Sequence, residues 1–284
     1  MTNAAEQWDA YYRGQGHTGC AEACIYKYDQ RLRMRAFGKV IDASVKASSD
    51  IRALDVGCGT GNVVALLRRR GYRVTGIDIS PAVAADTARR FASDDSVEIR
   101  PGAIEDAALG ETRFDLITSV TVLQHIMDAR DLEKALRNLG GAVKPDGVMF
   151  ALEIAPAWRM SASKLQAGVV ERTAAEWRML FASSGWRVDS ERCYAPWGPV
   201  LVHQFDRMVG RIVGPRSPTD AAPLAIGQSP IASEKRSFPK RILRAVFRGA
   251  RKCILLASWP LDHVLRLPGP AHFAYYRSFI LRPA

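Results

Sequence analysis

Long apolar runs are missing from this chain of 284 residues. A helix that spans a membrane needs roughly 18 or more consecutive apolar residues. The longest strong run here, Cys253 to Trp259, is far shorter and ends at Pro260. The first residues, Met1 to Gly14, are polar and lack the apolar core of a signal peptide. We therefore expect a cytoplasmic protein without a spanning helix.

Metal-binding and phosphate-binding patterns are also missing. The five cysteines form no C-x-x-C pair, and neither the cysteines nor the histidines show the spacing of a metal site. The phosphate-binding loop G-x-x-x-x-G-K-[ST] does not occur. The sequence thus predicts free thiols, no bound metal and no nucleotide site of the P-loop type.

Acidic residues are scarce in the second half of the chain. Residues 1–150 contain 20 Lys and Arg against 20 Asp and Glu, whereas residues 151–284 contain 20 against 9. The whole formal net charge of +11 therefore belongs to the second half. We expect any anionic partner to bind there.

Apolar residues make up 48% of the chain, which is enough for a sizeable core. Strand-like and helix-like segments alternate from Ile51 to Val188. The predicted strands are 52–56, 72–77, 96–100, 114–119, 147–154 and 186–194, and the predicted helices include 61–70, 81–92, 130–139 and 172–183. Such alternation predicts a mostly parallel sheet with helices on both faces.

The most informative segment runs from Ala53 to Gly61, with the sequence ALDVGCGTG. It predicts a buried strand, a glycine-rich turn and the start of a helix, and glycine lets a ligand approach the backbone closely. Asp78 follows Gly57 by 21 residues, at the end of the next strand. A carboxylate there is placed to accept hydrogen bonds from a ribose diol. We expect an adenosine-containing cofactor, and the alternative is a tight turn without a ligand.

The spacing of the glycines separates two cofactor classes. In the dinucleotide fingerprint G-x-G-x-x-G, counted from Gly57, the third glycine would fall at Asn62. Glycines at 57, 59 and 61, preceded by Asp55, instead resemble motif I of the class I S-adenosylmethionine-dependent methyltransferases. Segments 74–81, 97–106, 114–119 and 143–150 resemble further motifs of that family in the same order, so the resemblance covers residues 50–193.

This resemblance implies that S-adenosylmethionine binds beside the glycine turn and leaves as S-adenosylhomocysteine. It carries ten cofactor-binding residues over to this chain: Asp55, Gly57, Cys58, Gly59, Gly61, Asp78, Ile79, Ile104, Glu105 and Val120. One position departs from the family, since many members have an Asp that binds the adenine amino group where this chain has Ala103. Adenine recognition is then expected from the backbone around Ile104 or from Glu105.

The family topology implies a Rossmann-like α/β fold with a seven-stranded sheet, mostly parallel, whose last strand is antiparallel. The best candidate for that strand is Ala271 to Arg282. The expected organisation is an N-terminal helical cap segment (1–48), a methyltransferase core (49–198), a basic helical insertion or lid (199–270) and a C-terminal strand that completes the sheet (271–284).

Three side chains are candidates for the acceptor side. His125 follows the fourth strand at the edge where ligands bind. Its ordinary pKa of about 6.5 suits proton abstraction, and packing is the alternative. Glu153, at the end of the fifth strand, is expected to orient a hydroxyl or amine, or to pair with a nearby arginine. Tyr12 belongs to a segment that looks like the one closing over the cofactor in related enzymes, and its alternative is hydrophobic packing.

The positive charge is concentrated in residues 235–252, which contain eight basic residues and no acid. Lys240 to Trp259 has helical spacing, and Arg241, Arg244, Arg248 and Arg251 fall largely on one face. This pattern is typical of a solvated helix face. It is also typical of a surface that contacts anionic lipid headgroups or a phosphorylated substrate.

The functional hypothesis is methyl transfer to an oxygen or nitrogen of a small molecule, amphipathic or anionic, by in-line displacement with His125 as base. The basic second half raises the alternative of an RNA methyltransferase. Against it, the fourth strand ends in Ser119-Val120-Thr121 rather than the Asn/Asp-Pro-Pro-aromatic motif, and no Pro-Cys nucleophile or RNA-binding module is visible. A methyltransferase-like binding protein without catalysis is the second alternative, and the intact glycines and Asp78 argue against it.

Overall fold

The computed structural model describes residues 4–15, 23–45, 50–159, 168–194, 197–198, 201–202, 204–206, 208, 238–265 and 275–284. The chain divides into two compact units. The first unit is formed by residues 1–18, 34–194 and 275–284, and the second by residues 19–33 and 195–274.

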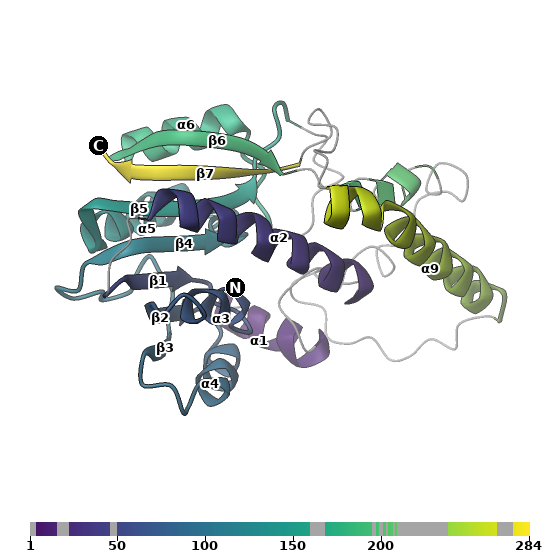
Figure 1. Cartoon of the computed structure of the whole chain (residues 1–284), viewed down its shortest axis with the longest axis horizontal. Coiled ribbons are helices and arrows are strands. Elements are labelled where there is room, and N and C mark those ends of the chain that lie inside the picture. Colours follow the sequence, from purple (N-terminus) through teal and green to yellow (C-terminus); the bar gives the residue numbers. More distant parts are fainter. Residues whose placement is uncertain are drawn as a thin grey trace. The chain divides into compact units, whose positions relative to one another are not determined.

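The first unit is built on a seven-stranded sheet in the order β3-β2-β1-β4-β5-β7-β6 (Figure 1). The strands are β1 (Arg52–Val56), β2 (Arg73–Asp78), β3 (Val97–Pro101), β4 (Phe114–Val120), β5 (Val143–Ile154), β6 (Trp186–Tyr194) and β7 (Tyr276–Pro283). Neighbouring strands from β3 to β5 are parallel, and β7 is antiparallel to both β5 and β6. The predicted seven-stranded sheet with an antiparallel last strand is confirmed.

Helices surround this sheet in the first unit (Figure 1). They are α1 (Ala4–Gln15), α3 (Asn62–Arg68), α4 (Pro81–Arg90), α5 (Ala129–Ala142), α6 (Ala174–Ser183), the short 3-10 helix η1 (Leu123–His125) and the part of α2 (Ala23–Ser44) that begins at residue 34. The helices predicted at 61–70, 81–92, 130–139 and 172–183 correspond to α3 to α6, with ends that differ by at most three residues.

Local sequence explains where two of these helices begin. The hydroxyl of Ser80 accepts a hydrogen bond from the Val83 N–H (3.1 Å), and Pro81 occupies the first position of α4. Thr173 and Glu176 form a capping box before α6, in which each side chain accepts from the other residue's backbone N–H. Helix α4 therefore starts three residues after β2 ends, and the Ala174 N–H at the start of α6 donates to the Pro156 carbonyl oxygen (3.0 Å), close to the end of β5.

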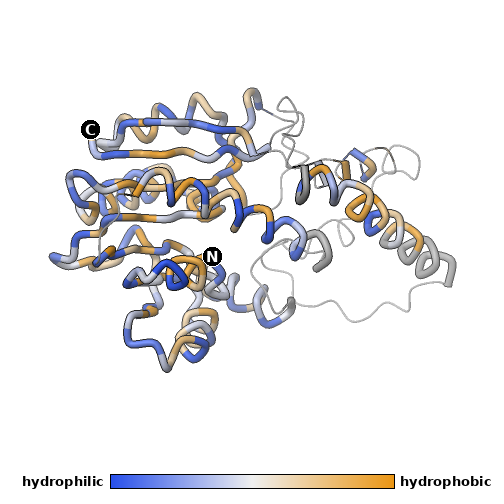
Figure 2. The backbone as a smooth tube through the Cα atoms, in the orientation of Figure 1, coloured by the Kyte–Doolittle hydropathy of each residue, from blue (hydrophilic) through white to orange (hydrophobic). Residues whose placement is uncertain are grey.

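The core of the first unit lies in two clusters, one on each face of the sheet. Ala53 and Leu54 belong to different clusters because successive side chains of a strand point to opposite faces. Residues of α5 and α6 complete one cluster, and residues of α2 and α3 complete the other. Strand β5 is buried from Gly147 to Ile154. Burial on both faces explains its apolar run from Val148 to Leu152, and Figure 2 shows hydrophobic residues along the strands in the middle of the sheet.

The second unit contains α9 (Phe238–Trp259) and the π-helical turn that follows it (Pro260–Leu265). Its described polar core is centred on Asp262, which accepts hydrogen bonds from the Tyr28 hydroxyl (2.8 Å) and from the N–H groups of Trp197 and Gly198 (2.7 Å each). Arg251 pairs with Asp206 at 2.9 Å. In the part of the chain that the structure describes, none of the helices combines the length and the apolarity needed to cross a bilayer.

Replacement of Trp177 by alanine should strongly destabilise the first unit. The indole is fully buried, and its Nε1–H donates to the Ile154 carbonyl oxygen (2.8 Å). Loss of such a ring typically costs about 3–5 kcal/mol, measurable as a lower midpoint of urea unfolding. Met179 on the same helix is 64% exposed, so Met179→Ala should change the free energy of unfolding by less than about 0.5 kcal/mol. Equal effects of the two substitutions would contradict this placement of α6.

Candidate functional site

The turn between β1 and α3 is built from glycines in the left-handed region. Gly57, Gly59 and Gly61 have φ values of +61°, +51° and +78°. A Cβ atom added at Gly57 would lie 2.3 Å from Cγ2 of Val122, in the turn that follows β4. Both the backbone conformation and the close approach of the two turns therefore require glycine at position 57.

Asp78 joins this turn to the start of α4. Its Oδ2 accepts a hydrogen bond from the Gly59 N–H (2.8 Å), and its Oδ1 accepts one from the Ser80 N–H (3.0 Å). Burial raises the pKa of Asp78, and the two backbone donors act in the opposite direction. The carboxylate is thus held in a fixed orientation at the carboxyl end of β2, with lone pairs left for a ligand.

A pocket of about 330 Å³ lies at the carboxyl ends of β1, β2 and β4. Six of the ten predicted cofactor residues line it: Gly57, Asp78, Ile79, Ile104, Glu105 and Val120. His125 lines the same pocket. The structure therefore brings together residues from four separate stretches of sequence, at the edge where ligands bind in open α/β sheets.

The other four predicted residues belong to β1 and its turn rather than to the pocket lining. Asp55 is buried, accepts a hydrogen bond from the Thr118 hydroxyl (2.7 Å), and has its pKa raised by burial to about 7. Its Oδ2 has no hydrogen-bond partner among the described residues. Burial also raises the pKa of Cys58, and Gly59 and Gly61 shape the backbone of the turn.

The loop after β3 forms the side of the pocket where the family's adenine-binding Asp is replaced by alanine. Ala103, Ile104 and Glu105 all line the pocket. The Asn138 side-chain amide donates to the carbonyl oxygens of Ile104 (3.2 Å) and Glu105 (2.8 Å). These hydrogen bonds hold the loop against α5. They keep the apolar residues Ala103 and Ile104 and the carboxylate of Glu105 in place at the pocket.

The pocket is acidic. Four carboxylates line it, those of Asp78, Glu105, Asp128 and Asp131, whereas the described lining residues include no lysine and no arginine. Aligned carboxylates in a concave site produce a negative potential that favours a cationic ligand.

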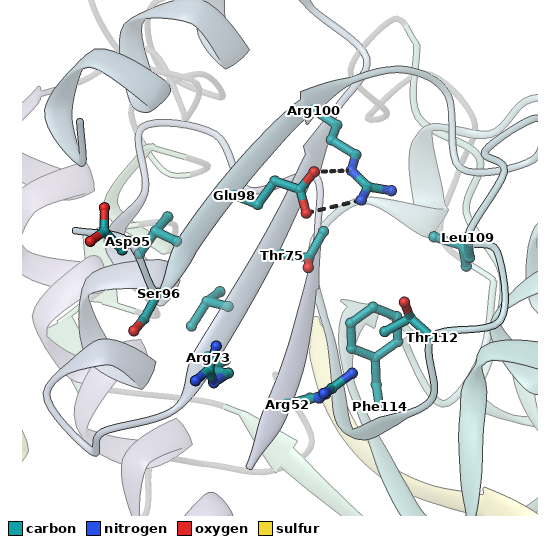
Figure 3. A pocket seen from close by; sticks show the side chains of 12 residues that line it. Arg52, Arg73, Thr75, Asp95, Ser96, Glu98, Arg100, Leu109, Thr112 and Phe114 are labelled. Carbon is teal, nitrogen blue, oxygen red and sulfur yellow. Dashed lines mark hydrogen bonds and ion pairs between the residues drawn. The ribbon is translucent and has the colours of Figure 1, made fainter. Parts of the chain in front are cut away.

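A second depression, of about 260 Å³, lies at the opposite ends of the same strands (Figure 3). Its lining includes Arg52, Arg73 and Arg100. Arg100 pairs with Glu98 at 2.7 Å, and Arg73 pairs with Asp50 at 3.1 Å. Because most of its charge is already neutralised by exposed ion pairs, this depression lacks the uniform charge of the pocket at the carboxyl edge.

Glu153 organises the turn after β4. It is fully buried, and its oxygens accept hydrogen bonds from the Ser119 hydroxyl (2.9 Å) and from the backbone N–H groups of Val122, Leu123 and Gln124 (3.2–3.3 Å). Burial raises its pKa to about 7 despite these donors. The expected ion pair with an arginine is not formed within the described residues; the carboxylate instead caps the N-terminus of η1.

His125 is the last residue of η1, and its ring is held from two sides. The Nδ1–H donates to the Gly168 carbonyl oxygen (2.8 Å), which leaves Nε2 as the acceptor nitrogen. The Gln124 side-chain amide approaches Nε2 at 3.4 Å. Burial lowers the pKa of His125, so the neutral ring is favoured near neutral pH.

Helix α1 supplies a side chain that sequence analysis did not assign. The Tyr12 hydroxyl donates to Asp86 (2.9 Å) on α4, and Tyr12 does not line the pocket. Trp8, one turn earlier, does line it and packs edge-to-face on His125, with 4.9 Å between ring centroids. The i, i+4 spacing of Ala4, Trp8 and Tyr12 puts all three on one face of the helix, so nothing in the sequence selects Trp8 over Tyr12.

Comparison with known proteins agrees with this geometry. A family model described as a methyltransferase domain matches residues 54–151. A ubiquinone biosynthesis O-methyltransferase from a Methylobacterium species is 34% identical over 102 residues, or 36% of this chain and 40% of that protein. The chain thus spans about two fifths of the length of the curated relatives of this name.

An uncharacterised methyltransferase of Mycobacterium bovis is 32% identical over 147 residues, which cover 50% of this chain and 72% of that protein. Among solved structures, the CcbJ methyltransferase from Streptomyces caelestis superimposes with a TM-score of 0.56 over 89% of this chain and 96% of that chain. Its 12% identity makes that likeness one of fold alone. The motifs, the sheet and the 32% identity to the Mycobacterium bovis methyltransferase, of which 72% is covered, show that the chain belongs to the class I S-adenosylmethionine-dependent methyltransferases.

Proposed function

We propose that the protein transfers a methyl group from S-adenosylmethionine to an oxygen of a small molecule in the cytoplasm, with nitrogen as the alternative acceptor atom. One observation carries the proposal. The glycine turn, the Asp78 carboxylate and the neutral His125 ring share a single acidic pocket. The choice of oxygen is supported by the relatives that are named O-methyltransferases.

The residues present fit the cofactor. S-adenosylmethionine carries a sulfonium and an ammonium, and the pocket offers four carboxylates without a basic side chain among its described lining residues. Gly57 has no Cβ where the two turns meet, and Asp55 Oδ2 is a buried acceptor without a described donor. Buried acceptors of this kind are satisfied by a donor such as an ammonium or an ordered water.

Each part of the pocket has a role in this proposal. The Asp78 carboxylate accepts hydrogen bonds from the ribose hydroxyls, and Ile104 with Glu105 contacts the adenine. The backbone at Gly57 lies against the methionine portion. When bound, the cofactor supplies an electrophilic methyl group on a positively charged sulfur. The protein's task is then to align the acceptor and exclude water, which is worth an effective molarity of about 10⁵–10⁸ M in favourable cases.

His125 is the base in this proposal. Bound S-adenosylmethionine would supply the methyl group to the acceptor oxygen, and its sulfur would keep the electron pair of the broken carbon–sulfur bond. The hydroxyl proton passes to Nε2 of His125, the acceptor nitrogen of the neutral ring, where the acceptor hydroxyl replaces the 3.4 Å contact with the Gln124 side-chain amide. Glu153 has no exposed surface, so we assign it to holding η1 and therefore the His125 ring, rather than to touching the acceptor.

We further propose that α9 contacts an anionic membrane surface. The helix contains six Lys and Arg residues and no acid in 22 residues. On the same helix Val246, Leu256 and Trp259 are exposed by 58%, 71% and 44%. A phosphorylated small molecule would be attracted by the charge alone, whereas a lipid surface also accounts for the exposed apolar side chains.

Gly57→Ala should weaken the binding of S-adenosylmethionine by at least about tenfold, or about 1.4 kcal/mol, in calorimetry. The added methyl group meets Val122 at 2.3 Å and forces the turn to shift. Gly110→Ala is the matched control, because Gly110 has a similar φ of +63° but nothing within 4 Å of an added Cβ. Equal affinities in the two variants would remove the glycine turn from the cofactor site.

Methyl transfer itself is tested with a cofactor that carries a labelled methyl group, incubated with a panel of hydroxylated small molecules and with a cell extract. Mass spectrometry should detect label in a small-molecule product, and the same mixture without the protein provides the blank. Label that enters only RNA or protein would contradict the proposed acceptor class.

His125→Asn should lower kcat by about 10²–10⁴-fold, the usual contribution of a positioned base. Cofactor affinity should not change, because an Asn amide can still donate to Gly168. In the wild type, kcat should be constant at high pH and fall as the ring is protonated. The midpoint should lie below the ordinary value of 6.5, because burial lowers the His125 pKa. An acid limb that persists unchanged in the variant would return His125 to a packing role.

Membrane contact is tested by sedimentation with phosphatidylglycerol vesicles, with phosphatidylcholine vesicles as the reference. Replacing Arg241, Arg244, Arg248 and Lys252 by Gln should weaken binding at least tenfold, since each basic residue near the surface contributes about 1 kcal/mol. Arg251 is left unchanged because it is buried and paired with Asp206. Equal partition of the wild type to both lipids would refute the contact.

A further inference from the structure

Trp8 lines the pocket but has no role in the reaction proposed above. It is the large aromatic side chain that α1 contributes to the pocket, and it is only partly buried. The planes of its indole and of the His125 imidazole are 87° apart, with centroids separated by 4.9 Å. The Tyr11 ring is likewise perpendicular to the indole (86°), with centroids 5.7 Å apart, so two rings contact Trp8 while the indole also lines the pocket.

The order of residues along the pocket places Trp8 near the reacting end. Ile104 and Glu105 form the adenine side, and Asp78 marks the ribose. Trp8 instead contacts His125, the group we assign to the acceptor proton. The methyl group must lie between the ribose and that base, so the sulfonium is expected on the side of the pocket that Trp8 shares with His125.

Helix α1 is held where this contact requires it. The Asp9 carboxylate accepts a hydrogen bond from the Ser80 hydroxyl and one from the Ala82 N–H (3.2 Å), at the N-terminus of α4. The Tyr12 hydroxyl adds the bond to Asp86 (2.9 Å). Two anchors on α4 thus hold the helix through Asp9 and Tyr12, which follow Trp8 in the sequence.

We propose that the indole of Trp8 binds the sulfonium of S-adenosylmethionine through a cation–π contact and thereby distinguishes the cofactor from its neutral product, S-adenosylhomocysteine. This inference rests on the proposed function, because it needs the cofactor in this pocket. A cation over an indole is stabilised by the negative face of the ring, most strongly where water is excluded. A neutral thioether has no such attraction, so the contact weakens as the methyl group leaves.

The groups beside Trp8 in the pocket are compatible with a cation over the indole. The His125 ring bonds to Gly168 through Nδ1–H and lies in a buried setting that favours its neutral form, so it does not repel the sulfonium. The carboxylates of Asp128 and Asp131 also line the pocket, but Asp128 is engaged by the N–H groups of Arg130 and Asp131. The indole therefore adds a directional contact for the cation to the general negative potential of the pocket carboxylates.

The test measures the affinities of S-adenosylmethionine and S-adenosylhomocysteine separately by calorimetry, without any acceptor. Trp8→Leu should weaken the former by about 30-fold, equivalent to about 2 kcal/mol, and the latter by less than about threefold. Trp8→Phe retains a ring and should lose less than Trp8→Leu. Circular dichroism and thermal unfolding of each variant establish that the fold is kept.

Tyr12→Phe is the matched control on the same helix, because it removes the bond to Asp86 and leaves the indole in place. It should change both affinities by the same factor. If Trp8→Leu also weakens both ligands equally, Trp8 only covers the pocket and the inference is overturned, while the proposed function stands. If the wild type binds neither ligand, the proposed function itself fails.

Discussion

The hydrogen bonds of Asp78 are the constraint on which the cofactor edge depends. One carboxylate accepts from the N–H of Gly59 in the first turn and from the N–H of Ser80 at the start of α4. A buried carboxylate is tolerated only when donors compensate its loss of water, and here the donors belong to two different loops. The Asp78 carboxylate therefore holds the two loops at a fixed distance from each other. Its remaining lone pairs can accept hydrogen bonds from a ligand.

Glu153 is a second buried carboxylate that hydrogen-bond donors hold in place, here in the turn after β4. It gathers three backbone N–H groups and the Ser119 hydroxyl around a buried anion. The turn that it holds contains Thr121 with a φ of +59°, a conformation that a β-branched residue adopts only under constraint. His125 follows on the same turn, so a fully buried carboxylate holds the turn that orients the proposed base.

The strands could be predicted from the sequence because the pattern of apolar residues along one strand is local information. The predicted bounds of β1 and β6 match the structure. Gly57, from the glycine turn, and Asp78 both line the pocket. Side-chain partners could not be predicted in the same way, because they depend on contacts between distant segments. Glu153 was expected near an arginine but is satisfied by backbone N–H groups, and Tyr12 was expected at the pocket where Trp8 lies. Trp8 and Tyr12 lie one turn apart on α1, and the composition of the helix does not show which of the two aromatic residues lines the pocket.

The distribution of charge also shows why the net value of a chain says little about its ligand. The protein carries a formal charge of +11, yet its pocket is lined by four carboxylates and by no described basic side chain. Screening makes charges more than about 8–10 Å away nearly irrelevant at exposed sites. The two halves of the sequence therefore differ in their electrostatics. The electrically balanced first half builds a pocket lined by carboxylates, and six Lys and Arg residues of the basic second half lie in α9.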